Sequence, residues 1–334
     1  MPPFRALKVH QLSVDFRAAT KIVEVPELPV ASPGNVVVQN HYVGINATDI
    51  NMTNGAYVPR PVPFSCGLEG VGVITAVGEG VGNIQIGDAV VYQQLGAFAE
   101  YIEVPSFAVI KVPTPDPAML PLMICATSGS IALEVVGHMK SGETILVTSA
   151  AGGTGQIVVQ LAKLAGNHVI ATCSSDGKVG QLKKLGCDRV INYSKEDIRD
   201  VLKNEYPKGI DLIFETIGGD MFKAAVENVA VHGRIVVFGF IAGYKDDQKG
   251  FAPYALSEVN PTLLMRSASV RGFFLGNHVT QIPAHTSRLL KLIENGKLTL
   301  GVDPTPFIGL EGVADAFDHM YAKKNIGKVA IKLV

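Results

Sequence analysis

From residue 144 onward, short apolar runs alternate with segments whose apolar residues recur at helical spacing, and this alternation limits the possible folds most. The first run, 144–149, has the length of a strand, and the apolar residues of 154–165 are spaced as on one helix face. Strands that alternate with helices form a parallel sheet covered on both faces. The sequence therefore predicts a doubly wound domain. Further strands are expected at 168–173, 189–191, 211–214, 234–238 and 269–274, and further helices at 179–185, 195–205 and 221–231.

The chain before about residue 127 has a different pattern. Short β-branched runs such as NVVVQNHYVGIN and GVGVITAVGEGV are bounded by Gly, Pro and Asn. This pattern is typical of a compact, largely antiparallel β domain. From about residue 278 the chain mixes helix and strand patterns and ends in GKVAIKLV, a strand expected to close back onto the N-terminal domain.

Charge and composition exclude several classes of partner. Lys and Arg number 29 and Asp and Glu 30, giving a net charge of −1, so we expect neither nucleic acid nor a membrane as partner. We expect no apolar run of the roughly 20 residues that a membrane span needs. The four cysteines form no CxxC pair, which predicts free thiols in a reducing compartment. The N-terminal residues lack the apolar core of a signal peptide, and the C-terminal KLV differs from the peroxisomal SKL, so we expect a cytoplasmic protein.

A glycine-rich turn follows the first predicted parallel strand. Residues 148–155 read Thr-Ser-Ala-Ala-Gly-Gly-Thr-Gly and open the first helix. Such a turn lets backbone amides and the helix N-terminus approach a pyrophosphate. The pattern is AxxGxxG-like rather than a strict GxGxxG, so its position between strand and helix is what predicts a dinucleotide site.

The end of the next strand distinguishes NADH from NADPH. An NAD site usually has an acidic residue there to hold the ribose hydroxyls. Here the strand ends in the segment 172–175 (TCSS), with Asp176 and Lys178 just beyond it. Hydroxyls and a nearby cation suit a 2′-phosphate, so the sequence favours NADPH.

Several segments resemble the medium-chain dehydrogenase/reductase superfamily, in particular its zinc-free quinone oxidoreductase and enone reductase branch. They are GDAVVY at 87–92, GAFAEY at 96–101, the turn at 148–155, SSDGK at 174–178 and LGCDRVINY at 185–193. The resemblance implies an α/β fold with a GroES-like β domain plus a Rossmann doubly wound parallel sheet. It also implies three segments: residues 1–127 as the first part of the GroES-like catalytic domain, 128–277 as the Rossmann NADPH-binding domain, and 278–334 as the C-terminal completion of the catalytic domain.

The resemblance further implies which residues contact NADPH. Some of these expected contacts have an alternative explanation. The phenylalanines could instead pack in the core, and Tyr193 could be an ordinary packed tyrosine. The expected contacts are Gly152, Gly153 and Thr154 near the phosphates, Ser174, Ser175, Lys178 and Tyr193 around the 2′-phosphate, Phe238, Gly239, Phe240, Ile241, Phe273, Phe274 and Leu275 near the nicotinamide, Asn325 from the C-terminal segment, and Thr127 and Ala151 as further cofactor contacts.

Zinc-dependent members of the superfamily hold a catalytic zinc with a Cys, a His and a further Cys or acid. This sequence has Asn46 where that Cys would lie and Leu68 in place of the His, and neither side chain suits zinc. Glu69 is expected to be a structural partner of the turn. The closely spaced cysteines of a structural zinc are missing from 92–100. We therefore expect no metal.

The lack of zinc ligands changes the expected chemistry. Alcohol oxidation needs a Lewis acid or a base for the alkoxide, whereas reduction of an activated alkene needs orientation and hydrogen bonds to an oxyanion. Candidate donors are Asn46, Tyr57 in the GAYVPRP loop and Tyr254 in the FAPYAL loop. We expect an NADPH-dependent reductase of α,β-unsaturated ketones, and the resemblance points to 15-oxoprostaglandins reduced at the 13,14 double bond.

Two alternatives remain open at this point. The first is an NADPH:quinone oxidoreductase similar to ζ-crystallin, and the second is a protein that binds NADPH without catalysis. The expected partner is a small-molecule enone or quinone. The resemblance also implies a possible homodimer through edge strands of the Rossmann sheet, with 267–275 as the candidate segment.

Overall fold

The computed structural model describes residues 3–57, 60–245 and 256–334. The chain divides into two compact units, one formed by 1–124 with 301–334 and the other by 125–300. The first boundary lies near the expected one at 127/128, but residues 278–300 belong to the second unit and not to the C-terminal completion. The reason is that the helix of this segment bonds to residues early in the second unit: the Thr286 hydroxyl lies 2.9 Å from that of Thr127.

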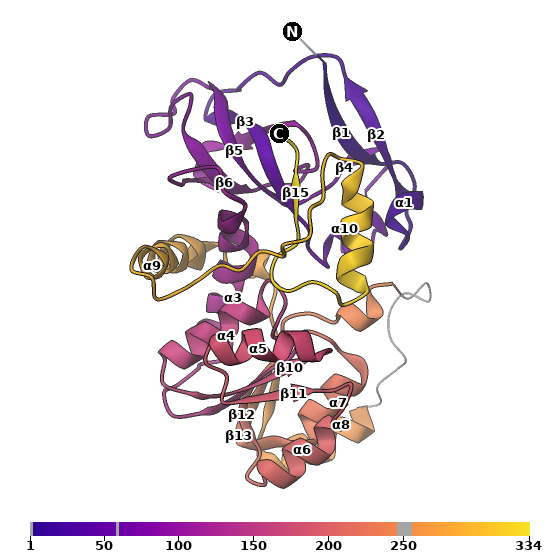
Figure 1. Ribbon diagram of the computed structural model, residues 1–334, viewed down its shortest axis with the longest axis vertical. Coiled ribbons are helices and arrows are strands. Elements are labelled where there is room, and N and C mark those ends of the chain that lie inside the picture. Colours follow the sequence, from indigo (N-terminus) through magenta and orange to yellow (C-terminus); the bar gives the residue numbers. More distant parts are fainter. Residues whose placement is uncertain (1–2, 58–59, 246–255) are drawn as a thin grey trace. The chain divides into compact units, whose positions relative to one another are not determined.

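The first unit contains two antiparallel sheets (Figure 1). One has the strand order β2-β1-β4, and the other has the order β15-β3-β5-β6-β8 with β7 also paired to β3. The elements of this unit are β1 (Phe4–Val9), α1 (Phe16–Ala19), β2 (Thr20–Val25), β3 (Asn35–Gly44), α2 (Asp49–Thr53), β4 (Phe64–Ser65), β5 (Glu69–Val77), β6 (Ala89–Gln93), β7 (Tyr101–Pro105), β8 (Val109–Lys111), α10 (Gly312–Tyr321) and β15 (Ala330–Lys332).

The C-terminal strand closes the first unit. In β15, Ala330 pairs with Gly44 and Ile331 with Val43 of β3, as the GKVAIKLV pattern predicts. The fully buried rings of Phe98 and Phe317 are part of the core beneath these strands. Residues more than 280 positions apart therefore share one hydrophobic core in this unit.

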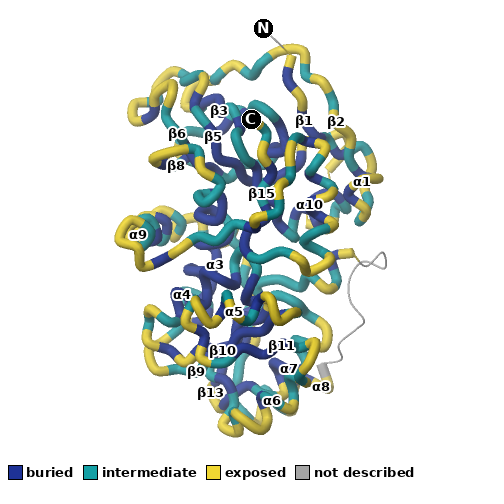
Figure 2. Tube along the Cα trace, viewed as in Figure 1, coloured by how far each residue is buried: buried dark blue, intermediate teal, exposed yellow. Residues whose placement is uncertain are grey.

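The second unit contains the predicted doubly wound sheet. All six strands are parallel, in the order β11-β10-β9-β12-β13-β14. β9 and β10 are almost entirely buried (Figure 2). The elements are α3 (Ser128–Ile131), β9 (Thr144–Val147), α4 (Gly155–Leu164), β10 (His168–Cys173), α5 (Asp176–Lys184), β11 (Arg189–Asn192), α6 (Ile198–Glu205), β12 (Ile210–Glu215), α7 (Gly219–Glu227), β13 (Val229–Val237), α8 (Leu256–Arg266), β14 (Ser269–Gly272) and α9 (Ile282–Glu294).

The order of these strands positions a binding site. From β9 the chain moves outward through β10 to β11, then returns to the other side of β9 and continues through β12, β13 and β14. Right-handed crossovers place the helices on opposite faces of the sheet on the two sides of β9, because the strand order reverses there. The carboxyl ends of β9 and β12 therefore form a topological switch point. Dinucleotides bind at such a point in open parallel sheets.

Two expectations about individual elements were wrong. The helix expected at 221–231 ends at Glu227, and its last apolar residues begin β13, where they pair with β12. In addition, residues 117–136 form a helical segment that is long and apolar enough to cross a membrane, the one such segment in the part of the chain that is described. Its most apolar window is 72% buried within the protein, which is typical of a core helix.

Candidate cofactor and active site

The predicted cofactor residues of the second unit lie in spatial order along one edge of its sheet. Tyr193 follows β11, Ser174 follows β10 and the 148–154 turn follows β9. On the far side of the switch point, Phe238 follows β13 and Phe273 follows β14. Neighbouring parallel strands end at the same edge. The residues expected at the 2′-phosphate, the pyrophosphate and the nicotinamide therefore follow one another across the sheet in the order of the groups in a dinucleotide.

The turn between β9 and α4 has the backbone geometry of a phosphate-binding loop. Ser149 has a φ of 50°, and its amide donates to the Thr172 hydroxyl at 3.2 Å. A Cβ at Gly155 would lie 2.5 Å from the carbonyl oxygen of Ser149, so only glycine fits there. The side chain of Thr154, the N-cap residue of α4, does not cap the amides of this helix. The N-terminal amides of α4 are thus suited to bind an anionic group.

The end of β10 has less negative charge than the sequence suggests. The carboxylate of Asp176 forms an ion pair with Lys195 and accepts from Asn192 Nδ2 at 2.8 Å. The hydroxyl of Ser175 does not cap α5, and Lys178 is buried in the first turn of this helix, just beyond the end of β10. These side chains at the end of β10 fit a 2′-phosphate group. Lys195 is a residue that the sequence reading missed.

Aromatic rings follow β13 and β14, at the part of the sheet edge where the nicotinamide is expected. Phe238 lies 5.2 Å from Phe273 in a stacked arrangement and 4.8 Å from Phe214. These contacts are core packing, the alternative considered for these residues. Their contact with the nicotinamide stays a prediction, as does that of Phe240, Ile241, Phe274 and Leu275.

At the switch point, polar groups follow β9 and β12. The Thr148 and Thr216 hydroxyls lie 3.1 Å apart, and the amide of Thr216 donates to Thr148 Oγ1 at 2.9 Å. The preceding Glu215 is fully buried and accepts from the amides of Ile217 and Gly218. Burial raises the pKa of this carboxyl to about 7, so it is partly protonated at neutral pH. These residues were not predicted, because single polar residues at strand ends carry no distinctive pattern.

In the first unit, Asn46 lies just beyond β3 and is 8% exposed. Its backbone amide donates to Asp49 Oδ2 at 2.8 Å, which fixes the turn into α2. Its side-chain Nδ2 donates to Glu69 Oε1 at 3.0 Å, and its Oδ1 accepts from Lys328 Nζ at 2.7 Å. The candidate donor is therefore held by a carboxylate and an ammonium group, both fully buried or nearly so.

The remaining predicted residues are placed as follows. Tyr57 follows α2, is 38% exposed, and its backbone amide donates to Asn51 O at 3.1 Å. Asn325 belongs to the first unit, where its Nδ2 donates to Gly327 O at 3.0 Å. Thr127 is fully buried and bonds to Thr286. Tyr254 lies outside the described residues.

The residues around Asn46 do not fit a zinc ion. Leu68 offers no ligand atom, and the oxygen of Asn46 already accepts from the ammonium of Lys328, which also forms an ion pair with Glu69. A metal cation there would meet this buried positive charge. Burial raises the pKa of the Cys66 thiol, whereas zinc binds the thiolate. Across the described residues, no three His, Cys, Asp or Glu side chains gather as a metal site.

The buried carboxyl of Asp49 gives a test by pH. Burial raises its pKa from 3.8 to about 8, so between these pH values the unfolded chain releases a proton that the folded chain keeps. The Asp49 contribution to the free energy of unfolding is complete below about pH 4 and falls by up to about 1.4 kcal/mol per pH unit until about pH 8.

We therefore expect Asp49→Asn to gain stability relative to the wild type as the pH rises from 5 to 8. Urea unfolding at each pH measures this difference, with the exposed carboxylate variant Asp220→Asn as control. A wild-type-to-variant difference that stays constant from pH 5 to 8 would contradict burial of a neutral Asp49.

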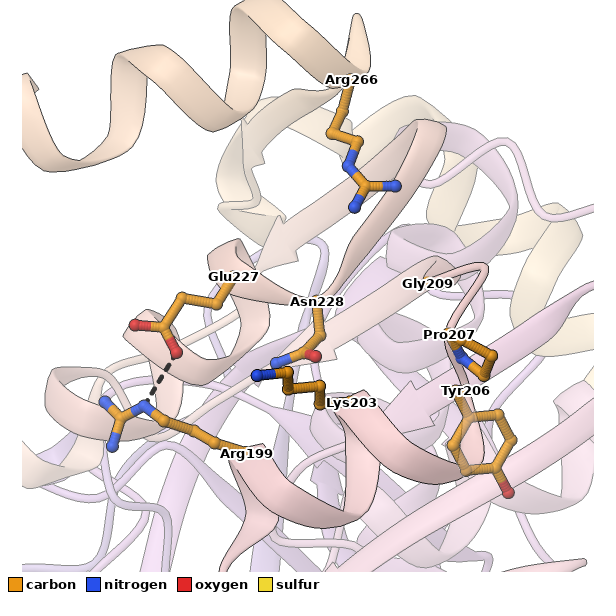
Figure 3. Close-up of a pocket in the computed structure, with 8 residues that line it drawn as sticks. All are labelled: Arg199, Lys203, Tyr206, Pro207, Gly209, Glu227, Asn228 and Arg266. Atoms are coloured by element: carbon orange, nitrogen blue, oxygen red, sulfur yellow. Dashed lines mark hydrogen bonds and ion pairs between the residues drawn. The ribbon is translucent and has the colours of Figure 1, made fainter.

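A pocket of about 370 Å³ lies elsewhere on the second unit (Figure 3). Gly209 and Asn228 of this pocket precede β12 and β13, so it lies at the amino ends of the strands. Its Arg199 donates to Glu227 at 2.9 Å. The pocket is therefore at the sheet edge opposite the cofactor residues. Its lining residues are Arg199, Lys203, Tyr206, Pro207, Gly209, Glu227, Asn228 and Arg266.

Two family models match the chain, one in each part of this architecture. Residues 32–114 match the alcohol dehydrogenase GroES-like domain, and residues 153–295 match the zinc-binding dehydrogenase model. Together with the fold and the site, these matches and the relatives below define the chain as a member of the medium-chain dehydrogenase/reductase superfamily, in its zinc-free quinone oxidoreductase and enone reductase branch. The protein is an oxidoreductase.

Two relatives and one solved structure support this family assignment. The chain is 43% identical over 336 residues to prostaglandin reductase-3 of Mus musculus, covering 98% of this chain and 89% of the relative. It is 44% identical over 334 residues to a probable quinone oxidoreductase of Leishmania amazonensis, covering 99% and 98%. The solved structure of a mycobacterial protein complexed with NADPH matches with a TM-score of 0.87 and 25% identity, covering 98% and 99%. The resemblance identified in the sequence is confirmed.

Proposed function

We propose that this oxidoreductase reduces the carbon–carbon double bond of α,β-unsaturated ketones. The first substrates to test are 15-oxoprostaglandins, reduced at the 13,14 double bond. NADPH is its cofactor and, when bound, supplies a hydride from C4 of the nicotinamide. The observation that carries the proposal is the Asn46 amide, held as a hydrogen-bond donor in a site that does not fit a metal. The 43% identity to a prostaglandin reductase supports the same choice of substrate.

The residues of the second unit would bind and orient the cofactor. The backbone of Ala151, Gly152, Gly153 and Thr154 would hold the pyrophosphate at the start of α4. Ser174, Ser175, Lys178 and Tyr193 would surround the 2′-phosphate at the ends of β10 and β11. The segments that follow β13 and β14 would lie along the nicotinamide half.

The residues of the first unit would act on the substrate carbonyl. An enone carbonyl withdraws electrons from its double bond, so the β-carbon accepts a hydride and the carbonyl oxygen becomes an enolate oxyanion. The remaining N–H of Asn46 would donate to that oxygen as its charge develops. The hydroxyl of Tyr57 is the second proposed donor. A proton from water then reaches the α-carbon and completes the saturated ketone.

A quinone oxidoreductase is the second candidate, favoured by the 44% identity to a relative with that name. It would share the fold, the cofactor and the hydride step. With a quinone, addition of the hydride and of a proton from water produces a hydroquinone and not a saturated ketone. The two candidates therefore differ in their products.

A panel of enones, quinones and simple aldehydes tests the proposal through loss of NADPH absorbance and analysis of the products. We expect rapid oxidation of NADPH with a 15-oxoprostaglandin or a linear enone, and the saturated ketone as product. Turnover of quinones alone would support the second candidate. Tight binding of NADPH without oxidation by any acceptor would contradict both and indicate a non-catalytic NADPH-binding protein.

The proposed assembly is a homodimer. β14 is one of the two edge strands of the parallel sheet, and an edge strand presents unpaired backbone groups that a second copy can pair with. Exposed apolar side chains flank it, among them Met265 at 80% and Phe274 at 57% exposed. These features support the 267–275 segment as the pairing edge.

A further inference from the structure

Three side chains of the first unit form a buried polar network. Lys328 is 2% exposed, Glu69 is 0% exposed and Asn46 is 8% exposed. The ammonium of Lys328 donates to Asn46 Oδ1 at 2.7 Å and forms an ion pair with Glu69 Oε1. Asn46 Nδ2 donates to the same Glu69 oxygen at 3.0 Å. Each side chain of the network thus contacts the other two.

The fold brings these residues together from three distant segments. Asn46 follows β3, Glu69 begins β5, and Lys328 precedes β15, and both β5 and β15 pair with the end of β3. Gly44 lies where they meet, and a Cβ there would be 2.6 Å from Glu69 Oε1 and 2.7 Å from Lys328 Cε. The space beside Gly44 is therefore occupied by the ion pair, which explains the glycine at this position.

The network allows only one orientation of the Asn46 amide. Its oxygen faces an ammonium group and its nitrogen faces a carboxylate. A flip of the amide would place the NH₂ group against the ammonium and the oxygen against the carboxylate, and both contacts would be repulsive. Of the two N–H groups on Nδ2, one is used by Glu69. The other has no partner within the described part of the chain.

We propose that Lys328 and Glu69 are positioning residues that fix and polarise the Asn46 amide, so that its second N–H is aimed at the substrate oxyanion. The inference rests on the proposed function, in which Asn46 is the donor. A cation bonded to an amide oxygen strengthens the N–H groups of the same amide as donors. The buried ammonium thus supplies positive charge at this site without a metal, and it does so through Asn46 rather than by touching substrate.

The first test uses a variant that lacks both charges of the network and should still fold. Replacing Lys328 or Glu69 alone would leave an unpaired buried charge, whereas the double variant Lys328→Met/Glu69→Met removes both charges together. We expect this double variant to unfold cooperatively and to bind NADPH with an unchanged Kd. We expect its kcat for an enone to fall by about 10- to 100-fold, because the donor loses its fixed orientation.

A variant cycle separates positioning from a general structural role. If Lys328 and Glu69 act through Asn46, the triple variant Asn46→Ala/Lys328→Met/Glu69→Met should have the kcat of Asn46→Ala within about twofold. Losses in kcat that multiply instead would contradict the proposal. A folded double variant with wild-type kcat would also contradict it.

An NMR measurement tests the same claim without turnover. The side-chain ¹⁵N–¹H resonances of Asn46 are identified by their loss in Asn46→Ala. In the double variant we expect both N–H resonances to shift, and the difference between them to shrink as the amide becomes mobile. Unchanged resonances would overturn the positioning role. If the wild-type protein reduces no enone, the proposed function fails, and this measurement still decides whether the network fixes the amide.

Discussion

Asn46→Ala should lower kcat for enone reduction by about 10²- to 10³-fold, the typical loss when one oxyanion donor is removed. The side chain lies just beyond β3, held between Glu69 and Lys328, so its loss removes a proposed donor whose orientation the fold determines. The Kd of NADPH should stay near the wild-type value, because the proposed phosphate-binding residues lie in the second unit. Stopped-flow kinetics and fluorescence titration measure these two quantities.

Asn51→Ala is the matched control for this result. Asn51 is also a buried asparagine, 2% exposed, and follows Asn46 by five residues within α2. Its Nδ2 has no hydrogen-bond partner in the described structure, so its removal disturbs α2, the helix that follows Asn46, without touching the proposed donor. If both variants lose kcat equally, the effect reflects disruption of α2. A folded Asn46→Ala variant with kcat within about twofold of wild type would exclude Asn46 as the donor.

The second large effect concerns the choice of cofactor. Lys178→Ala should raise the Kd of NADPH by about 10- to 100-fold, the worth of a hydrogen bond to a charged group, and change the Kd of NADH much less. The reason is that Lys178 lies in the first turn of α5, which follows β10, where the 2′-phosphate is expected and where NADH has only a hydroxyl. Isothermal titration with both cofactors measures the two Kd values.

Lys195→Ala serves as the basic control beside this site. Lys195 is proposed to act only by neutralising the exposed Asp176 and not by contacting the phosphate, so its loss should weaken NADPH binding less than the loss of Lys178. Equal changes in the Kd of NADPH and NADH on substitution of Lys178 would refute a 2′-phosphate role for this lysine.

The sequence predicted the second unit well because its signals are local. Strand and helix patterns alternate between turn residues, so β10 (His168–Cys173) has the expected bounds and α4 (Gly155–Leu164) nearly so. Errors arose where local pattern and tertiary pairing compete. Val229 fits the helical spacing of 221–231, yet it begins β13 because its backbone pairs with Ile210 of β12. The expected boundary at residue 278 differs from the structure for another reason: α9 bonds to residues early in the second unit, such as Thr127 and Ser130, and no local pattern indicates these contacts.

The candidate site was predicted in part for a similar reason. The cofactor residues follow successive strands, and strand ends can be read from the sequence. By contrast, Lys328 contacts Asn46 across 282 positions of the chain, and no spacing or motif indicates that contact. Glu69 was expected only as a partner of its turn, because a single carboxylate gives no sign of the ammonium group that balances it. The electrostatics of the site therefore had to come from the tertiary structure.

The most direct test of this account follows the hydride into the product. The wild-type protein is incubated with a 15-oxoprostaglandin and NADPH that carries deuterium at C4, and the product is examined by mass spectrometry and NMR. The account predicts the saturated ketone with one deuterium on the former β-carbon. An allylic alcohol with deuterium on the carbonyl carbon, or a substrate recovered without deuterium, would contradict it.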